Sequence, residues 1–188
     1  MMSKKGCLAT VAAALAFVLS GCSGGGSDGG TVGYSIPKSL CGVAVAPKLL
    51  EPFLPAGKQL AVKEDEPVAD VITTCELSID DAVVVSIERE RREPGASPRD
   101  IAVNQLNVGN PEESSTGGYV YSDRIAVSVV RCDSPRAVAE DLSSIVKVLK
   151  PGIADKSAMK SFIASYTTAY KKQQPCRDEN GSPAPTAP

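Results

Sequence analysis

The sequence predicts an α+β domain built around an antiparallel sheet, and three observations support this prediction. Two stretches alternate apolar and polar residues on either side of a short polar turn, which is typical of half-buried hairpins. Near the C-terminus, apolar residues recur with helical spacing. Four cysteines beyond position 22 are an even number, which suits two disulfides. We therefore expect one domain over residues 37–176, with a sheet of about four strands from two hairpins packed by C-terminal helices.

A short helical turn and an acidic loop are expected ahead of the first hairpin. Residues 46–54 offer the helical turn, and Pro47 suits its first position. Residues 58–67 contain the acidic run Glu64-Asp65-Glu66. They lack the alternating oxygen ligands and the glycine of a calcium loop, so we expect a solvated loop there.

The first hairpin is expected from residue 71 to residue 91. The alternate residues of its first strand that face one way are Val71, Thr73, Cys75, Leu77 and Ile79. Asp80-Asp81 can turn the chain, and the return strand places Val83, Val85 and Ile87 on one face. The run Glu88–Glu93 mixes both charge signs, which is more typical of a solvated strand end than of a docking patch.

A short helix and a second hairpin are expected next. Ser97 is placed as an N-cap ahead of Pro98, and this helix is expected to end near Leu106. Residues 107–118 form a loop by composition. Residues 119–132 then form the second hairpin around a turn at Asp123-Arg124, and its second strand is apolar on both faces, as in a central strand.

Two C-terminal helices are expected to cover the sheet. Ser134-Pro135-Arg136 would open the first helix, whose helically spaced apolar positions are Val138, Leu142, Ile145, Val146 and Leu149. Asp155 would cap the second helix, whose apolar stripe consists of Met159, Phe162, Ile163, Tyr166 and Tyr170. The polar, proline-rich residues 177–188 are expected to be a disordered tail.

The cysteines Cys41, Cys75, Cys132 and Cys176 allow three disulfide connectivities, which the sequence alone does not separate. We favour Cys41 with Cys75, and Cys132 with Cys176, because each bridge would tie a helical segment to a neighbouring strand. The closed loops of about 34 and 44 residues would each contribute at most about 4 kcal/mol in the chain-entropy model. The alternative is a zinc site of four thiolates, which is disfavoured because the chain has no C-x-x-C pair.

The first 22 residues have the pattern of an export signal. Lys4 and Lys5 precede Leu8–Leu19, an apolar run of 12 residues. At about 1.5 Å per residue this run reaches about 18 Å, short of the roughly 30 Å of a bilayer core, so it predicts a secretory signal and not a membrane span. The run ends in Leu19-Ser20-Gly21-Cys22, which resembles the lipobox of bacterial lipoproteins.

The resemblance implies a processing route and a location. In bacterial lipoproteins the cysteine thiol, here Cys22, is linked to diacylglycerol, and a signal peptidase cuts before it, here between Gly21 and Cys22. Residues 1–21 would be the signal peptide, and residues 22–36 would be the lipidated cysteine with a flexible Gly/Ser-rich tether. The chain would then lie at the extracytoplasmic face of the cell membrane, held by its lipid anchor. The alternative is an ordinary cleaved signal in which Cys22 is incidental.

Composition excludes several functional classes. A net charge of −2 without a basic cluster argues against nucleic-acid binding. The absence of histidine removes the commonest metal ligand and the side chain best suited to proton transfer near neutral pH. Ser157 to Lys160 matches the S-x-x-K of Ser/Lys hydrolases, but Ser35 to Lys38 and Ser144 to Lys147 match it too, and the partner motifs S-D-N and K-T-G are absent.

We therefore expect a non-catalytic binding or interaction module, and not an enzyme, with neither cofactor nor metal. Its partner would be a protein of the cell envelope or a small ligand. The composition also resembles that of small actinobacterial surface lipoproteins of uncharacterised function, which supply no catalytic residue to transfer. The alternative is a carrier of lipid or another apolar ligand, because an aromatic content of 4% leaves room for an internal cavity. A Ser/Lys hydrolase is less favoured than either.

Overall fold

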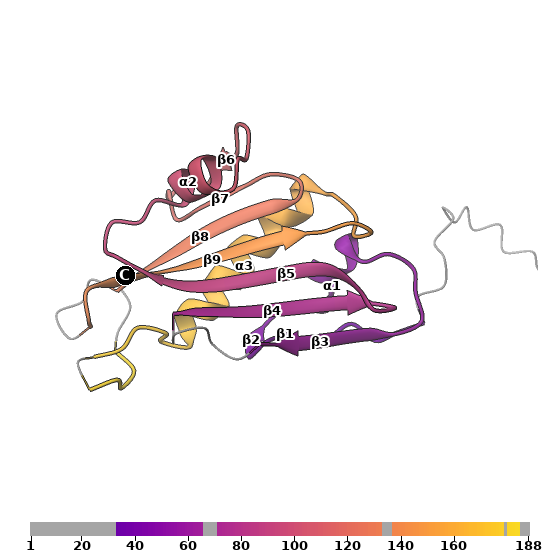
Figure 1. The fold of residues 1–188 in the computed structure, drawn as a ribbon, viewed down its shortest axis with the longest axis horizontal. Coiled ribbons are helices and arrows are strands. Elements are labelled where there is room, and N and C mark those ends of the chain that lie inside the picture. Colours follow the sequence, from indigo (N-terminus) through magenta and orange to yellow (C-terminus); the bar gives the residue numbers. More distant parts are fainter. Residues whose placement is uncertain (1–32, 66–70, 133–136, 179, 185–188) are drawn as a thin grey trace, which may run out of the picture.

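The chain forms an α+β domain with a large antiparallel sheet. The computed structural model describes residues 33–65, 71–132, 137–178 and 180–184. Its seven-stranded sheet has the order β3-β4-β5-β9-β8-β7-β6, and β1 and β2 form a separate pair (Figure 1). The predicted fold class is confirmed, but the expected four-strand count is wrong because β3, β6 and β9 extend the two predicted hairpins.

The strands and helices have the following bounds. The strands are β1 Ser39–Leu40, β2 Val43–Ala44, β3 Leu60–Glu64, β4 Ile72–Ile79, β5 Ala82–Arg92, β6 Glu112–Glu113, β7 Tyr119–Tyr121, β8 Ile125–Cys132 and β9 Glu140–Val148. The helical elements are α1 Pro47–Leu50, η1 Glu51–Phe53, α2 Pro98–Asp100, the π-helical η2 Ile101–Gln105 and α3 Lys156–Lys172.

Helix α3 covers one face of the sheet, as predicted for the last helix. The Asp155 carboxylate accepts a hydrogen bond from the backbone N–H of Ala158 at 2.9 Å, which caps the first turn. Lys171 and Lys172 lie in the last turn, where cations suit the helix dipole. The residues of α3 that are buried against the sheet are Met159, Phe162, Ile163 and Tyr166. This face of the sheet therefore holds the main core of the domain.

Strand β9 replaces the first of the two predicted C-terminal helices. The expected helix over residues 138–149 is wrong, because Glu140–Val148 pairs with β5 on one side and with β8 on the other. Both faces of this central strand are covered, so its apolar residues do not alternate and their spacing imitates a helix. The Ser134-Pro135-Arg136 start of that helix lies outside the described residues. One long helix, and not two, packs on the sheet in the described part of the chain.

Both predicted hairpins are confirmed, with one local correction. β4 pairs with β5 and β7 pairs with β8, and Cys75, Leu77 and Ile79 are buried as the alternation predicted. A bulge opposite Leu77 and Ser78 shifts the register of β5, so Val84 and Val85 are both buried and Val83 is only partly buried. The expected inward position of Val83 is therefore wrong.

Within the described ranges, a short helical segment covers the second face of the sheet over β7, β8 and β9. Ser97 caps the short helical segment by accepting from the backbone N–H of Asp100 at 3.3 Å, as predicted. The segment packs Ile101 and Ala102 against Val127 and Ile145. β8 is consequently buried on both sides, which confirms its prediction as a central strand.

The two favoured disulfides are both present. Cys41, in the turn between β1 and β2, is bonded to Cys75 of β4. Cys132, at the end of β8, is bonded to Cys176, which follows α3. The second bridge holds the segment after α3 against the end of the sheet.

The expectation of disorder from residue 177 onward is not met by residues 177, 178 and 180–184. The Asp178 carboxylate accepts hydrogen bonds at 2.9 Å from the backbone N–H groups of Asn180 and Ser182. The N–H of Ala184 donates to the carbonyl of Cys176 at 2.8 Å, and Ala184 is buried. This segment folds back because its turn satisfies its own backbone and because the adjacent disulfide fixes its start.

The lipobox residues Leu19, Ser20, Gly21 and Cys22 lie outside the described residues. Within the parts of the chain that the structure describes, we find no helix with the length and apolar character needed to cross a bilayer.

Candidate functional site

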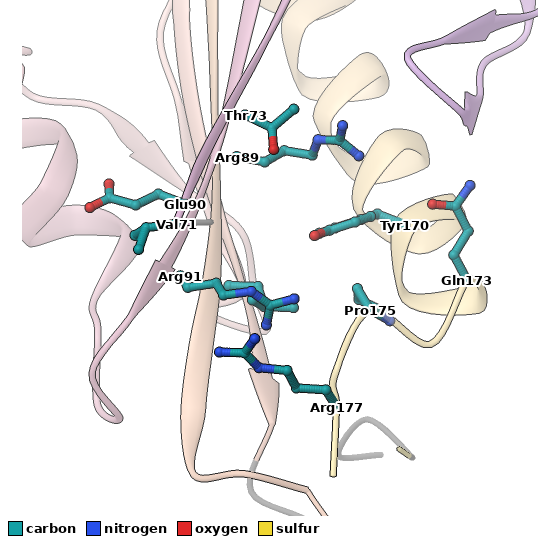
Figure 2. A pocket seen from close by; sticks show the side chains of 10 residues that line it. Val71, Thr73, Arg89, Glu90, Arg91, Tyr170, Gln173, Pro175 and Arg177 are labelled. Carbon is teal, nitrogen blue, oxygen red and sulfur yellow. The ribbon is translucent and has the colours of Figure 1, made fainter. Parts of the chain in front are cut away.

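A polar cavity of about 560 Å³ opens at the end of the sheet where β4 begins and β5 ends. It lies between the α3 face of the sheet and the segment that follows α3. Arg89, Arg91, Arg177 and Tyr170 converge on it, and we call these four residues the arginine pocket (Figure 2). Val71, Leu142 and Pro175 add apolar wall, while Thr73 and Gln173 add hydroxyl and amide groups.

The strand periodicity explains why two arginines reach this pocket together. Arg89 and Arg91 are two residues apart on β5, so both point to the face that carries Val85 and Ile87 in the core. Their side chains lie beyond the last buried residue of α3, which is Tyr166. The apolar face of the sheet thus ends in two guanidinium groups at the rim of the core.

Tyr170 forms the helix side of the pocket. The Arg89 guanidinium carbon lies 5.8 Å from the centre of the Tyr170 ring, which is within the range of a cation–π contact. Burial raises the pKa of the Tyr170 hydroxyl, and the positive charges of Arg89 and Arg91 oppose that rise. The hydroxyl therefore stays protonated at neutral pH and can donate a hydrogen bond.

Two carboxylates hold the three arginines in place. Arg89 pairs with Glu64 at the end of β3, and Arg91 pairs with Glu140 of β9. The Nε atom of Arg177 also lies 3.7 Å from Oε1 of Glu140. Among the residues that the structure describes, three guanidinium groups thus face two carboxylates, which leaves an excess of one positive charge. Glu90 does not change this balance, because it pairs with Arg92 and points to the opposite side of the sheet (Figure 2).

One buried donor of the pocket lacks a hydrogen-bond partner among the described residues. The Nε of Arg89 is buried without an acceptor there, although Nη2 of the same side chain contacts Glu64. Guanidinium groups donate but do not accept hydrogen bonds. Among the described residues, the pocket therefore presents mainly hydrogen-bond donors and suits an oxyanion.

The structure separates or exposes the serine and lysine pairs that matched S-x-x-K. Ser144 is buried on β9 and Lys147 is three residues away, so the two side chains point to opposite faces of the sheet. Ser157 and Lys160 lie in the first turns of α3, away from the arginine pocket, and the Lys160 ammonium sits 5.9 Å from the centre of the Tyr121 ring. No group of His, Cys, Asp and Glu side chains in the described ranges is arranged to hold a metal ion.

The arginine pocket was missed by the sequence prediction. Glu88–Glu93 was expected to be a solvated strand end, but the side chains of Arg89 and Arg92 are only 16% exposed. Arg177 was placed in a disordered tail. A usable signal did exist, because Arg89 and Arg91 share the strand parity of the buried Val85 and Ile87.

Comparison of the chain with protein-family models, with curated proteins and with solved structures finds no match.

Proposed function

We propose that this chain is a lipid-anchored, extracytoplasmic binding module of the cell envelope, and that the arginine pocket is where it binds an anionic ligand. The single observation that supports the binding site best is the convergence of Arg89, Arg91 and Arg177 with the Tyr170 hydroxyl on one cavity. Arginine is suited to this role because its planar fork matches the geometry of carboxylate and phosphate oxygens.

The proposed location rests on the first 22 residues. The charged start, the apolar run Leu8–Leu19 and the ending Leu19-Ser20-Gly21-Cys22 together have the order of a lipoprotein signal. Two disulfides in the domain agree with an oxidising compartment. Diacylglycerol on Cys22 would give a two-chain anchor, which holds a protein at a bilayer far more firmly than one chain.

Binding is favoured over catalysis by the chemistry of the pocket. A hydrolase needs a nucleophile activated by a base, whereas the pocket contains guanidinium groups, which only donate hydrogen bonds, and a tyrosine whose pKa is raised. The alternative of an apolar-ligand carrier has less support, because Met159, Phe162, Ile163 and Tyr166 fill the space between α3 and the sheet.

Two measurements test the proposal. Intact-mass analysis of the chain isolated from membranes should show a start at Cys22 that carries diacylglycerol, and a Cys22→Ala variant should leave the membrane fraction. An unmodified Cys22 in the membrane-isolated chain would contradict the anchor.

Anion binding is tested by titrating the full chain with labelled acidic peptides and with glycerol phosphate. Arg91→Gln and Arg177→Gln should each weaken binding by about tenfold, since each removes a charge-assisted contact. Arg131→Gln is the matched control, because Arg131 is 52% exposed and belongs to the opposite face of the sheet. Equal affinities for all three variants would remove the pocket from the proposal.

A further inference from the structure

We propose that the arginine pocket binds a carboxylate carried by an acidic segment of another envelope protein, and that this carboxylate takes the place of the chain's own Glu64. The inference rests on the proposed function of a binding module and specifies its ligand class.

The two carboxylates that pair with the arginines of the pocket differ in how firmly they are held. Glu140 lies on the central strand β9, is 9% exposed and has two arginines beside it. Glu64 is the last residue of the edge strand β3, is 44% exposed and has Arg89 as its partner. The Glu64 carboxylate is 44% exposed, so water can solvate it when it leaves, and the incoming carboxylate then takes over the pairing of the largely buried Arg89. Glu140 is therefore the fixed counter-charge of the pocket's arginines, whereas Glu64 is the exchangeable one.

The contact between Glu64 and Arg89 uses one of the two donors on that side of the guanidinium. Glu64 contacts Nη2 of Arg89, while the Nε of the same guanidinium is buried with no acceptor in the described ranges. A carboxylate that approaches the guanidinium side-on can accept from Nε and Nη2 together, which is the bidentate geometry that arginine favours. The ring of Tyr170 holds the guanidinium plane in position for this approach. The arginine is therefore prepared for a planar carboxylate that binds through two oxygens.

The position of the pocket on the domain favours a partner protein over the lipids of the chain's own membrane. The described chain begins at Gly33, whose N–H donates to the carbonyl of Gly57 at 2.9 Å. Lys58 and Gln59, which directly follow Gly57, donate their backbone N–H groups to the Asp80 carboxylate at the turn between β4 and β5. The arginine pocket lies at the other end of these two strands, about 25 Å away along the eight residues of β4. The pocket thus opens away from the end at which the N-terminal segment enters.

The test uses the full chain in phosphatidylcholine nanodiscs and a fluorescent hexaglutamate peptide, with hexaglutamine as the neutral counterpart. Glycerol phosphate and monomeric short-chain phosphatidylglycerol serve as phosphate competitors, one soluble and one lipid. The Glu64→Gln variant should bind hexaglutamate about threefold to tenfold more tightly, because Arg89 is then released from its internal partner. Arg89→Gln should weaken binding by about tenfold.

Glu76→Gln is the matched control, because Glu76 is a carboxylate next to β3 that faces the opposite side of the sheet. Its affinity should stay within about twofold of the unmodified chain. Circular dichroism of each variant checks that the domain is folded. Tighter binding by Glu64→Gln alone, with no binding of hexaglutamine, is the result we expect.

Three other results would overturn the inference in distinguishable ways. If Glu64→Gln binds like the unmodified chain while Arg91→Gln weakens binding, the pocket binds anions without exchanging Glu64, and the proposed function survives. If a phosphate competitor binds and hexaglutamate does not, the ligand is a phosphate, and the lipid and soluble forms tell its source. If no probe binds, or if a probe binds equally well to all arginine variants, the inference and the proposed anion site fail together.

Discussion

The guanidinium of Arg91 pairs with the carboxylate of Glu140, which lies diagonally across from it on the neighbouring strand β9. Arg177 approaches the same carboxylate from the segment after α3, and Cys176 precedes it in a disulfide to Cys132. Cys132 is in turn the residue of β8 directly opposite Glu140. One buried carboxylate and one disulfide therefore set the positions of two of the three arginines in the pocket.

Replacing Glu140 with glutamine should destabilise the domain. The variant keeps the shape of the side chain but leaves two partly buried guanidinium groups without their counter-charge, so we expect a loss of about 1–2 kcal/mol in the free energy of unfolding. This figure is below the full value for a buried pair because Arg91 is still 28% exposed to solvent. Urea unfolding followed by circular dichroism measures the difference.

Asp65→Asn provides the comparison for Glu140→Gln. Asp65 pairs with Lys63 at 2.6 Å, but both side chains are largely exposed. Its loss should change the free energy of unfolding by less than about 0.5 kcal/mol. Equal urea midpoints for the two variants would show that the more buried Glu140 pair contributes no more to the free energy of unfolding than the exposed Asp65 pair does.

Removing the Cys132–Cys176 disulfide should affect both stability and anion binding. The double variant Cys132→Ser/Cys176→Ser frees a loop with a sequence separation of 44 and should lose about 2–4 kcal/mol in the free energy of unfolding. Because Arg177 follows Cys176 directly, we also expect acidic-peptide affinity to fall by about tenfold. Peptide titration at a temperature where the variant is folded separates the two effects.

The other disulfide distinguishes general destabilisation from loss of the pocket. Cys41→Ser/Cys75→Ser should lower stability by a similar amount, since its separation of 34 gives a similar loop entropy. It leaves the Cys132–Cys176 bridge in place, so Arg177 keeps its position and affinity should fall by less. If both double variants lose affinity equally, the disulfide beside Arg177 has no particular role in the pocket.

The position of β9 shows where sequence patterns stop being sufficient. The two hairpins and α3 were predictable because each has one buried face, so alternation or helical spacing appears in the sequence. β9 is covered by α3 on one face and by η2 on the other, and this double burial removes the alternation. The β-branched residues Ile145, Val146 and Val148 were the remaining sign of a strand.

The arginine pocket was less predictable than the fold because it joins distant parts of the chain. Arg89 and Arg177 are brought together by the sheet order and by contacts of the segment after α3, among them the Cys132–Cys176 disulfide. The disulfide pairing itself was predicted correctly, and it placed the segment near residue 176 against the end of β8. Recognising that β5 lies between β4 and β9 was the missing step, since Glu140 of β9 can then pair with Arg91.

Replacing Tyr166 with phenylalanine should make the domain less sensitive to alkaline pH. The Tyr166 hydroxyl is buried without a partner in the described part of the chain, and burial raises its pKa. Above about pH 10 an unfolded tyrosine ionises while the folded one keeps its proton, so this group's contribution to stability falls as pH rises. We expect the Tyr166→Phe variant to be at least as stable as the unmodified chain at neutral pH. At about pH 11 it should lose less stability than the unmodified chain does.

Tyr34→Phe is the contrasting tyrosine variant. The Tyr34 hydroxyl donates to the carbonyl of Pro55 at 2.6 Å, so its removal should cost about 0.5–1.5 kcal/mol at neutral pH. Thermal unfolding across the pH range measures both variants. A loss at neutral pH for Tyr166→Phe as large as that for Tyr34→Phe would mean that the Tyr166 hydroxyl has a hydrogen-bond partner.

Replacing Glu112 with glutamine should reduce stability at neutral pH and have little effect in acid. The carboxylate accepts from the Lys156 ammonium at 2.6 Å and from the Tyr121 hydroxyl at 2.8 Å, and both contacts lower its pKa below the ordinary 4.5. A carboxylate whose pKa is lower in the folded chain than in the unfolded chain stabilises the fold at pH values above its unfolded-state pKa. This contribution is lost as the pH falls through its folded-state pKa. Urea midpoints should therefore differ between the two chains at about pH 7 and converge at about pH 2.

Glu113→Gln removes the neighbouring exposed carboxylate of β6 and should show a smaller difference at both pH values. A gap between Glu112→Gln and the unmodified chain that stayed constant with pH would mean that shape, and not charge, makes Glu112 stabilise the contact between β6 and α3.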